Sequence, residues 1–125
     1  MGWFQLVNSN ENDQDIIVRT YNFDNKEIVS IGRSSACDIQ VDNAAVSREH
    51  AKIKIAIIDG NERYTLYDSG SNNGTFINKQ KVMGERTLQD KDRIAVCGQQ
   101  TIIFRAGNIH RQGETYNKTY VYRAD

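Results

Sequence analysis

Short segments of alternating polar and apolar residues, separated by turn-forming residues, dominate this chain of 125 residues. Lys52–Ile57 and Arg63–Asp68 both alternate in this way, with the period of a half-buried β-strand. Asp59-Gly60-Asn61 lies between them and predicts a tight hairpin turn. Further segments rich in β-branched and aromatic residues are predicted as strands: Trp3–Val7, Ile16–Thr20, Glu27–Ile31, Ile39–Val41, Thr75–Ile77, Arg93–Val96 and Thr101–Arg105.

These patterns predict an all-β fold. No sustained apolar helical period appears, and the chain has no proline, so its turns depend on Gly, Asn and Asp. Many short strands separated by regular turns are typical of a sandwich or a barrel. The length fits one domain, which we place at residues 1–105.

Residues 106–125 form a polar C-terminal extension of this domain. Within it, Thr119–Tyr122 either forms one more edge strand or belongs to a mobile tail. The aromatic residues of this segment favour the strand, because aromatic side chains are enriched in strands.

Charge and composition exclude several classes of partner. Lys plus Arg and Asp plus Glu both number 16, so the formal net charge is zero and no basic footprint for nucleic acid is expected. The longest apolar run, Ile55–Ile58, is too short to cross a bilayer, and no leader-like apolar stretch follows Met1. Cys37 and Cys97 do not make a disulfide framework, so we expect a protein of the reducing cytoplasm.

Three separated segments place a guanidinium, hydroxyls and amides where predicted strands give way to loops: Gly32-Arg33, Ser47–His50 and Asn72–Thr75. A phosphate offers several acceptor oxygens, and its natural partners are an Arg fork, a hydroxyl and amide donors. If these loop ends converge, they can bind one such anion. Taken alone, Arg33 also fits a surface ion pair, and Ser47 also fits a turn cap.

In this order, Gly32-Arg33, Ser47-x-x-His50 and Asn73-Gly74-Thr75 resemble the motifs of the forkhead-associated (FHA) family, and the resemblance covers roughly residues 28–104. It implies an FHA/SMAD-like fold, a two-sheet antiparallel β-sandwich of about eleven strands with its binding loops at one end. It also implies a non-enzymatic module, without a cofactor, that mediates phosphorylation-dependent protein–protein interactions in signalling. Its partner would be a protein carrying phosphothreonine, the product of a Ser/Thr kinase.

The resemblance also assigns roles to the residues expected to contact the phosphopeptide. Arg33 binds the phosphate or braces the peptide backbone, and the Ser47 hydroxyl donates to a phosphate oxygen. Arg48 adds a second charge-assisted contact, and the Asn73 amide bonds to the peptide main chain. Asn72 stands where the family often has a Ser or Thr that contacts the phosphate, so this chain departs from the pattern there.

Four further residues are expected to support the loops. Gly32 allows a close backbone approach or an unusual φ, and Gly74 permits a positive φ in its turn. Thr75 starts the next strand and braces the loop before it. His50 is structural in the family that the chain resembles, with its ring nitrogens tied to backbone groups of the binding loops.

Two other functions are compatible with these residues. The first is an FHA-fold adaptor that binds an unphosphorylated partner or self-associates through the C-terminal tail, where phosphorylated Thr115 or Thr119 would be the ligand. The second is a hydrolase with Ser47 as nucleophile and His50 as base, but no nucleophile elbow or oxyanion loop is evident.

No His and Cys spacing typical of a metal site appears. The polar turn at 79–81, with its two lysines, is expected to be solvated.

Overall fold

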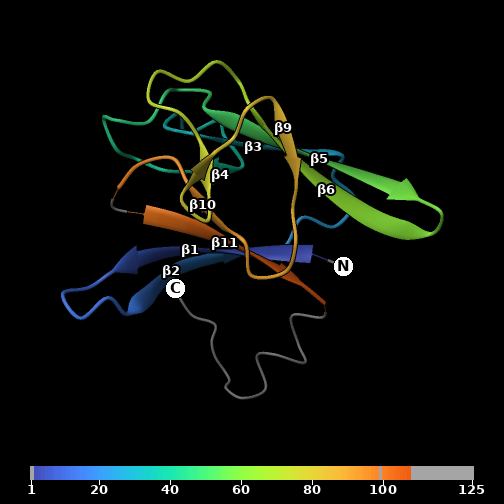
Figure 1. Cartoon of the computed structure of the whole chain (residues 1–125), viewed down its shortest axis with the longest axis horizontal. Coiled ribbons are helices and arrows are strands. Elements are labelled where there is room, and N and C mark those ends of the chain that lie inside the picture. The colour runs from blue at the N-terminus through green and yellow to red at the C-terminus, as the bar shows by residue number, and fades with distance from the viewer. Residues whose placement is uncertain (1, 99, 108–125) are drawn as a thin grey trace.

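The computed structural model describes residues 2–98 and 100–107, and the regular elements of this part are all β-strands in two layers (Figure 1). The strands are β1 (Gly2–Ser9), β2 (Asp15–Tyr21), β3 (Ile28–Gly32), β4 (Ile39–Gln40), β5 (Ala51–Ile58), β6 (Asn61–Asp68), β7 (Phe76–Ile77), β8 (Gln80–Lys81), β9 (Glu85–Thr87), β10 (Arg93–Ala95) and β11 (Gln100–Ala106). The predicted all-β class and the predicted strand number are therefore confirmed.

The strands form two sheets, with the order β2-β1-β11-β10-β7-β8 in the first sheet and β4-β3-β5-β6-β9 in the second. Paired strands are antiparallel except β3 and β4, which pair in parallel through Ile31–Ile39 and Gly32–Gln40. The predicted two-sheet sandwich is confirmed, with one parallel pair that was not predicted. The sequence patterns did not predict β8 and β9, which are short and mostly exposed.

The hydrophobic core lies between the two sheets, and strand alternation decides which side chains reach it. In β5, Ala51 and Ile53 are buried, whereas Lys52 and Lys54 are exposed. Phe4 of β1 contributes to the same core from the first sheet and is fully buried. Burying one large apolar side chain of this kind stabilises a fold by about 1.5–3 kcal/mol, so this alternation fixes the register of the sheets.

The hairpin between β5 and β6 has the predicted turn. Ile58 pairs with Asn61, and the two residues between them, Asp59 and Gly60, have positive φ values of 54° and 81°. Two positive φ values in a two-residue loop are typical of a type I′ turn. This turn lies at the opposite end of the sandwich from the β3–β4, β4–β5 and β6–β7 loops, which meet at one end as predicted (Figure 1).

The predicted boundary at residue 105 falls inside β11, which continues to Ala106. Residues 108–125, with the predicted strand at Thr119–Tyr122, lie outside the described residues. The choice between an edge strand and a tail therefore stays a prediction. Within the part of the chain that the structure describes, no helix has the length and apolar character needed to span a membrane.

Gly32, the last residue of β3, brings two loops into backbone contact. The Arg33 N–H donates to the Ser47 carbonyl at 3.0 Å, immediately after this glycine. A Cβ atom on Gly32 would lie 2.2 Å from the Arg48 carbonyl oxygen, far inside van der Waals contact. Of the two roles predicted for Gly32, the structure therefore has the close backbone approach.

Gly32→Ala is expected to lower the free energy of unfolding by about 1–3 kcal/mol, because the methyl group forces the two loops apart. Gly98→Ala is the matched control, since a Cβ atom on Gly98 meets no atom within 4 Å. Thermal unfolding followed by circular dichroism measures both variants. Equal melting temperatures for the two variants would contradict the close approach.

Candidate functional site

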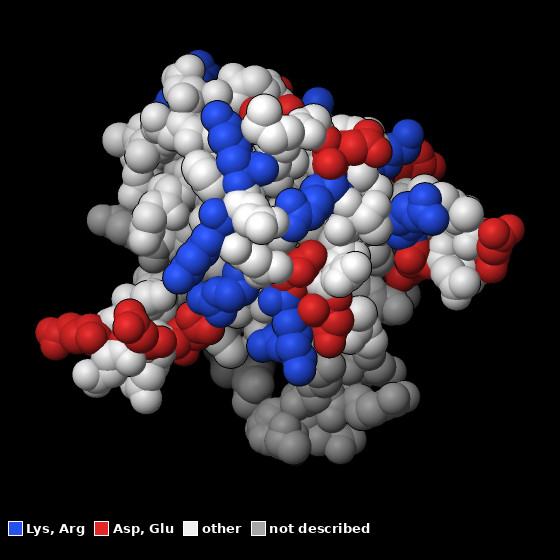
Figure 2. Space-filling view, in the orientation of Figure 1, with Lys and Arg blue, Asp and Glu red and all other residues white. Residues whose placement is uncertain are grey.

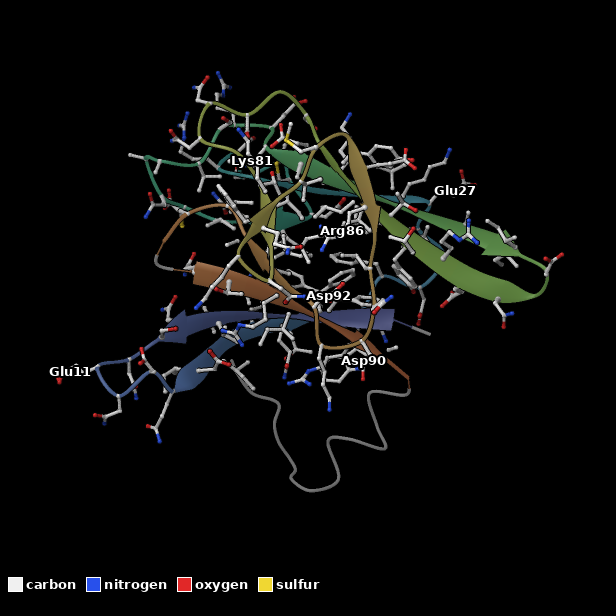
Figure 3. All side chains as sticks on the ribbon, viewed as in Figure 1. Glu11, Glu27, Lys81, Arg86, Asp90 and Asp92 are labelled. Atoms are coloured by element: carbon white, nitrogen blue, oxygen red, sulfur yellow. The ribbon has the colours of Figure 1, made fainter. Side chains whose placement is uncertain are left out.

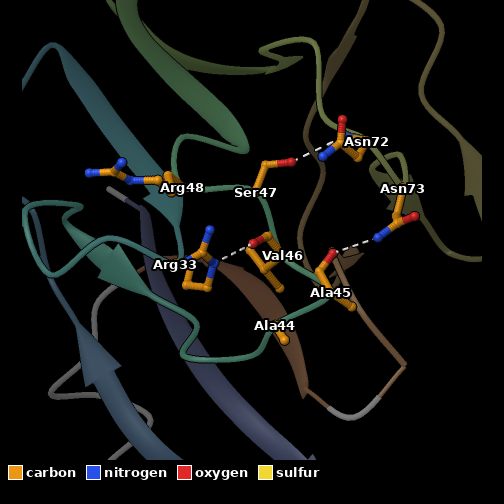
Figure 4. A pocket seen from close by; sticks show the side chains of 8 residues that line it. All are labelled: Arg33, Ala44, Ala45, Val46, Ser47, Arg48, Asn72 and Asn73. Carbon is orange, nitrogen blue, oxygen red and sulfur yellow. Dashed lines mark hydrogen bonds between the residues drawn. The ribbon is translucent and has the colours of Figure 1, made fainter.

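Three loops at one end of the sandwich line a single open pocket (Figure 4). The lining residues are Arg33, Ala44, Ala45, Val46, Ser47, Arg48, Asn72 and Asn73. The structure thus brings together all five residues that the sequence predicted as ligand contacts. They come from the ends of different strands: the first follows β3, two precede β5, and two lie between β6 and β7.

Arg33 is held by a hydrogen bond from one edge of its guanidinium, the Nε–H group. Its Nε donates to the Val46 carbonyl oxygen at 3.0 Å, while the side chain as a whole is exposed. Among the described residues, no acceptor binds its two terminal nitrogens. Arg33 therefore presents paired donors to the pocket in a fixed orientation, which suits a multidentate anion.

His50, immediately before β5, is fully buried and joins two loops. Its Nδ1 accepts a hydrogen bond from the Ser47 N–H at 3.0 Å, and its Nε2 lies 2.8 Å from the Gly74 carbonyl oxygen. Nδ1 accepts a hydrogen bond and therefore carries no proton, whereas Nε2 faces a carbonyl oxygen, which only accepts, and therefore carries one. With a single ring proton, the imidazole is neutral. His50 thereby fixes the distance between the Ser47 loop and the Gly74 loop.

Ser47 also contacts the β6–β7 loop, which contains Asn72 and Gly74, through its side chain. Its Oγ accepts a hydrogen bond from the Asn72 N–H at 3.1 Å. A hydroxyl that accepts one bond still has its own proton to donate, so the Ser47 proton is available to a ligand oxygen. The same geometry argues against a Ser–His nucleophile, because His50 contacts the Ser47 backbone and not its hydroxyl.

Asn73 and Arg48 occupy opposite parts of the pocket rim. The Asn73 Nδ2 donates to the Ala45 carbonyl oxygen at 2.7 Å, which links the β6–β7 loop to the β4–β5 loop. The amide keeps an oxygen and a second N–H hydrogen for other partners. Arg48 is exposed, and Figure 4 shows its guanidinium extending away from Ser47. Asn72 and Asn73 are exposed as well.

Asp68, the last residue of β6, organises the loop that carries the two asparagines, and sequence reasoning missed it. Its Oδ1 accepts the backbone N–H groups of Gly70 and Ser71 at 2.8 and 2.7 Å. Its Oδ2 accepts the hydroxyls of Ser71 and Thr75 at 2.6 and 2.7 Å. The available signal was an Asp two residues before a Gly, a pattern typical of side-chain-stabilised turns.

The hydrogen bonds to Asp68 also control its ionisation. Burial disfavours the charged carboxylate and raises the pKa, but the bonds from Ser71, Thr75 and Gly70 outweigh burial and lower the pKa to about 2. Asp68 is therefore ionised at neutral pH. An ionised carboxylate with four donors holds the β6–β7 loop more firmly than a neutral side chain would.

Gly74 and Thr75 complete this loop. Gly74 has a φ of 90°, a conformation that glycine adopts without steric cost. Thr75 is fully buried, and its backbone carbonyl accepts the Val82 N–H at 2.8 Å. The two residues thus connect the binding loop to the β7–β8 hairpin.

The described residues include no group of three or more His, Cys, Asp or Glu side chains arranged to hold a metal ion. Cys37 and Cys97 are both free thiols. The Cys37 Sγ donates to the Arg48 carbonyl oxygen at 3.3 Å, close to the pocket. Burial raises the pKa of the Cys37 thiol, so the thiol stays protonated and serves as a hydrogen-bond donor.

Fold and site together define a small β-sandwich module whose pocket is built from the loops between strands. The chain belongs to the FHA domain family, because the family model for this domain matches residues 29–97. That span contains the three loops that line the pocket. The FHA domain is an interaction module and not an enzyme family.

Proteins similar to this chain in sequence and in structure also include FHA domains. Glycogen accumulation regulator GarA of Mycobacterium tuberculosis is 33% identical over 92 residues, which cover 74% of this chain and 52% of GarA. The FhaA FHA domain, solved in complex with the intracellular domain of Rv3910, has 30% identity and a TM-score of 0.63 over 84% of this chain and 100% of that chain. An FHA domain solved in work on phosphothreonine-dependent interactions has 27% identity and a TM-score of 0.59, over 86% and 99% of the two chains. This chain spans about half or less of the curated relatives' length.

Asp68→Asn is expected to lower the free energy of unfolding by about 1.5–3 kcal/mol at neutral pH, because it replaces a charged acceptor of several hydrogen bonds. The pKa of Asp68 in the fold is about 2, below its ordinary value of 3.8. Its stabilising contribution is therefore complete above about pH 4 and lost as the pH falls through about 2. Denaturant unfolding at both pH values measures the difference between the variant and the unmodified chain.

Asp42→Asn, at an exposed position, is the control for this comparison and is expected to leave stability nearly unchanged. A stability loss in Asp68→Asn that stays constant from neutral pH down to about pH 2 would contradict the role of the charge.

Proposed function

We propose that this domain binds a phosphothreonine residue in an extended segment of a partner protein, the product of a Ser/Thr kinase. One observation carries the proposal: Arg33 and Ser47 line one pocket, each is already held by another hydrogen bond, and each keeps donors that a ligand can use. This donor set matches the oxygens of a phosphate. The function is recognition and not catalysis.

The phosphate supplies most of the binding energy in this proposal. Each hydrogen bond to a charged group contributes about 1.5–3 kcal/mol. Losing two or more of them on dephosphorylation costs on the order of 4 kcal/mol, which is about a thousandfold in affinity. The domain therefore distinguishes the phosphorylated from the unphosphorylated partner.

The remaining pocket residues act on the rest of the peptide. Asn73 lies on the rim with an amide oxygen and one N–H hydrogen still available, which suits an extended peptide backbone. Asn72 has an amide where a hydroxyl would donate to phosphate, so its contribution is weaker than that of Ser47. Arg48 adds charge at the rim and makes a direct contact only if its side chain turns toward the pocket.

The relatives support this proposal. Interactions of one similar FHA domain depend on phosphothreonine, and EmbR of Mycobacterium tuberculosis was solved in complex with a phosphopeptide. Free Cys37 and Cys97 suit a reducing cytoplasmic compartment, which we propose as the location. The proposal requires no cofactor, nucleic acid or membrane.

Arg33→Ala is expected to weaken binding of phosphothreonine peptides at least about a hundredfold, because it removes paired charge-assisted donors. Arg33→Lys keeps the charge but loses the planar fork, so its affinity is expected to lie between those of the unmodified chain and Arg33→Ala. Binding to a phosphothreonine peptide library, measured by fluorescence polarisation, compares these variants with Arg63→Ala on β6, remote from the pocket. Retained affinity in a folded Arg33→Ala protein would refute the site, and equal binding of unphosphorylated peptides would favour the adaptor alternative.

Affinity for a phosphothreonine peptide is expected to fall as the pH drops below about 6, where the phosphate loses its second charge. A peptide with glutamate in place of the phosphothreonine is the control, since its carboxylate keeps its charge in this range. Isothermal titration calorimetry across this pH range measures both. A flat profile for the phosphopeptide would count against binding of the dianion.

A further inference from the structure

Lys81 of β8 lies beside the binding loop, outside the pocket described above. β8 pairs with β7, and Lys81 stands directly opposite Phe76 in that pairing. A Cβ atom on Gly74 would lie 3.4 Å from the Lys81 Cε and 3.3 Å from the Phe76 ring. The Lys81 stem therefore packs against the glycine that follows Asn73, and its ammonium group is one bond further along.

This packing restricts a side chain that the sequence predicted as simply solvated. Lys81 is exposed, but its aliphatic stem contacts the loop and leaves the charged head in water. The Val82 N–H donates to the Thr75 carbonyl oxygen at 2.8 Å, which anchors β8 to the same loop. The Lys81 stem therefore lies beside Gly74, the residue that follows Asn73 in the binding loop.

The Lys81 charge is not neutralised within the described part of the chain. No ion pair among the described residues includes Lys81. The carboxylate that organises this loop, Asp68, accepts four hydrogen bonds from the loop itself. Lys81 therefore offers an unpaired positive charge to whatever lies along this side of the pocket.

Other basic side chains continue from Lys81 along the same face. Figure 2 shows several Lys and Arg side chains on this face with Asp and Glu side chains among them, and Figure 3 labels Lys81 and Arg86 in the same view. Arg86 donates to the Gln80 side-chain oxygen at 3.2 Å, a neutral partner that leaves its charge uncompensated. Lys81 and Arg86 thus add positive charge beside the β7–β8 hairpin, although the chain has a net charge of zero.

We infer that Lys81 selects phosphothreonine segments with acidic residues on one side of the phosphothreonine. This inference rests on the proposed function and names the class of ligand for the same site. A peptide held at Asn73 by its backbone extends past the loop and brings a flanking Asp or Glu to the Lys81 ammonium group. The preference is modest, because an exposed ion pair changes affinity only about twofold to fivefold.

A degenerate phosphothreonine peptide library, retained on the immobilised domain and sequenced by position, tests the inference. The unmodified chain is expected to enrich Asp and Glu at one or more positions on one side of the phosphothreonine. Lys81→Gln is expected to lose this enrichment and Lys81→Glu to reverse it, with binding of neutral-flanked peptides retained. Lys79→Gln is the matched control, because Lys79 lies in the far turn of the same hairpin, away from Gly74.

The outcomes separate the inference from the proposed function. If no phosphothreonine peptide is retained by the unmodified chain, the proposed function fails. If peptides are retained without acidic enrichment, or if Lys81→Gln keeps the enrichment, only the role of Lys81 is overturned. Equal loss in Lys81→Gln and Lys79→Gln would also overturn it, since the effect would then be one of general charge. Increasing salt is expected to weaken the acidic preference in the unmodified chain.

Discussion

A buried neutral imidazole holds the binding end of this domain together. His50 accepts a hydrogen bond from the Ser47 N–H and donates one to the Gly74 carbonyl oxygen, so it connects two loops that are distant in the sequence. Because His50 is inaccessible to water, leaving either bond unmade would cost about 1–3 kcal/mol. The loops therefore have a defined separation before any ligand arrives.

This fixed arrangement determines which atoms are available for binding. Arg33 uses Nε and Ser47 uses one oxygen lone pair within the domain, so the other N–H groups of Arg33 and the O–H of Ser47 remain as donors. Asp68 fixes the opposite loop by accepting four hydrogen bonds. A ligand rich in acceptors meets donors that are already in place, which reduces the entropy cost of binding. In the proposed selectivity, Lys81 adds a positive charge beside this loop and favours peptides with acidic residues on one side of the phosphothreonine.

Strand alternation predicted the all-β class, and the resemblance of three short motifs to the FHA family implied the two-sheet sandwich and the residues that line the pocket. The ends of strands bring distant residues such as Arg33 and Ser47 together, so motifs at strand ends reveal a shared site. β8 and β9 could not be predicted, because they are short, lack apolar alternation and are strands only through pairing with their neighbours. The bonds of Asp68 and the packing of Lys81 on Gly74 depend on loop geometry, which residue type and spacing do not specify.

The protonation of the His50 ring tests the central claim most directly, since the imidazole can make both of its hydrogen bonds to the two loops only when it is neutral with its proton on Nε2. Long-range proton–nitrogen NMR spectra of the free, nitrogen-labelled domain at neutral pH report which ring nitrogen carries the proton. We predict a protonated Nε2 and an unprotonated, hydrogen-bonded Nδ1. A proton on Nδ1, or a ring that averages between tautomers, would contradict the account.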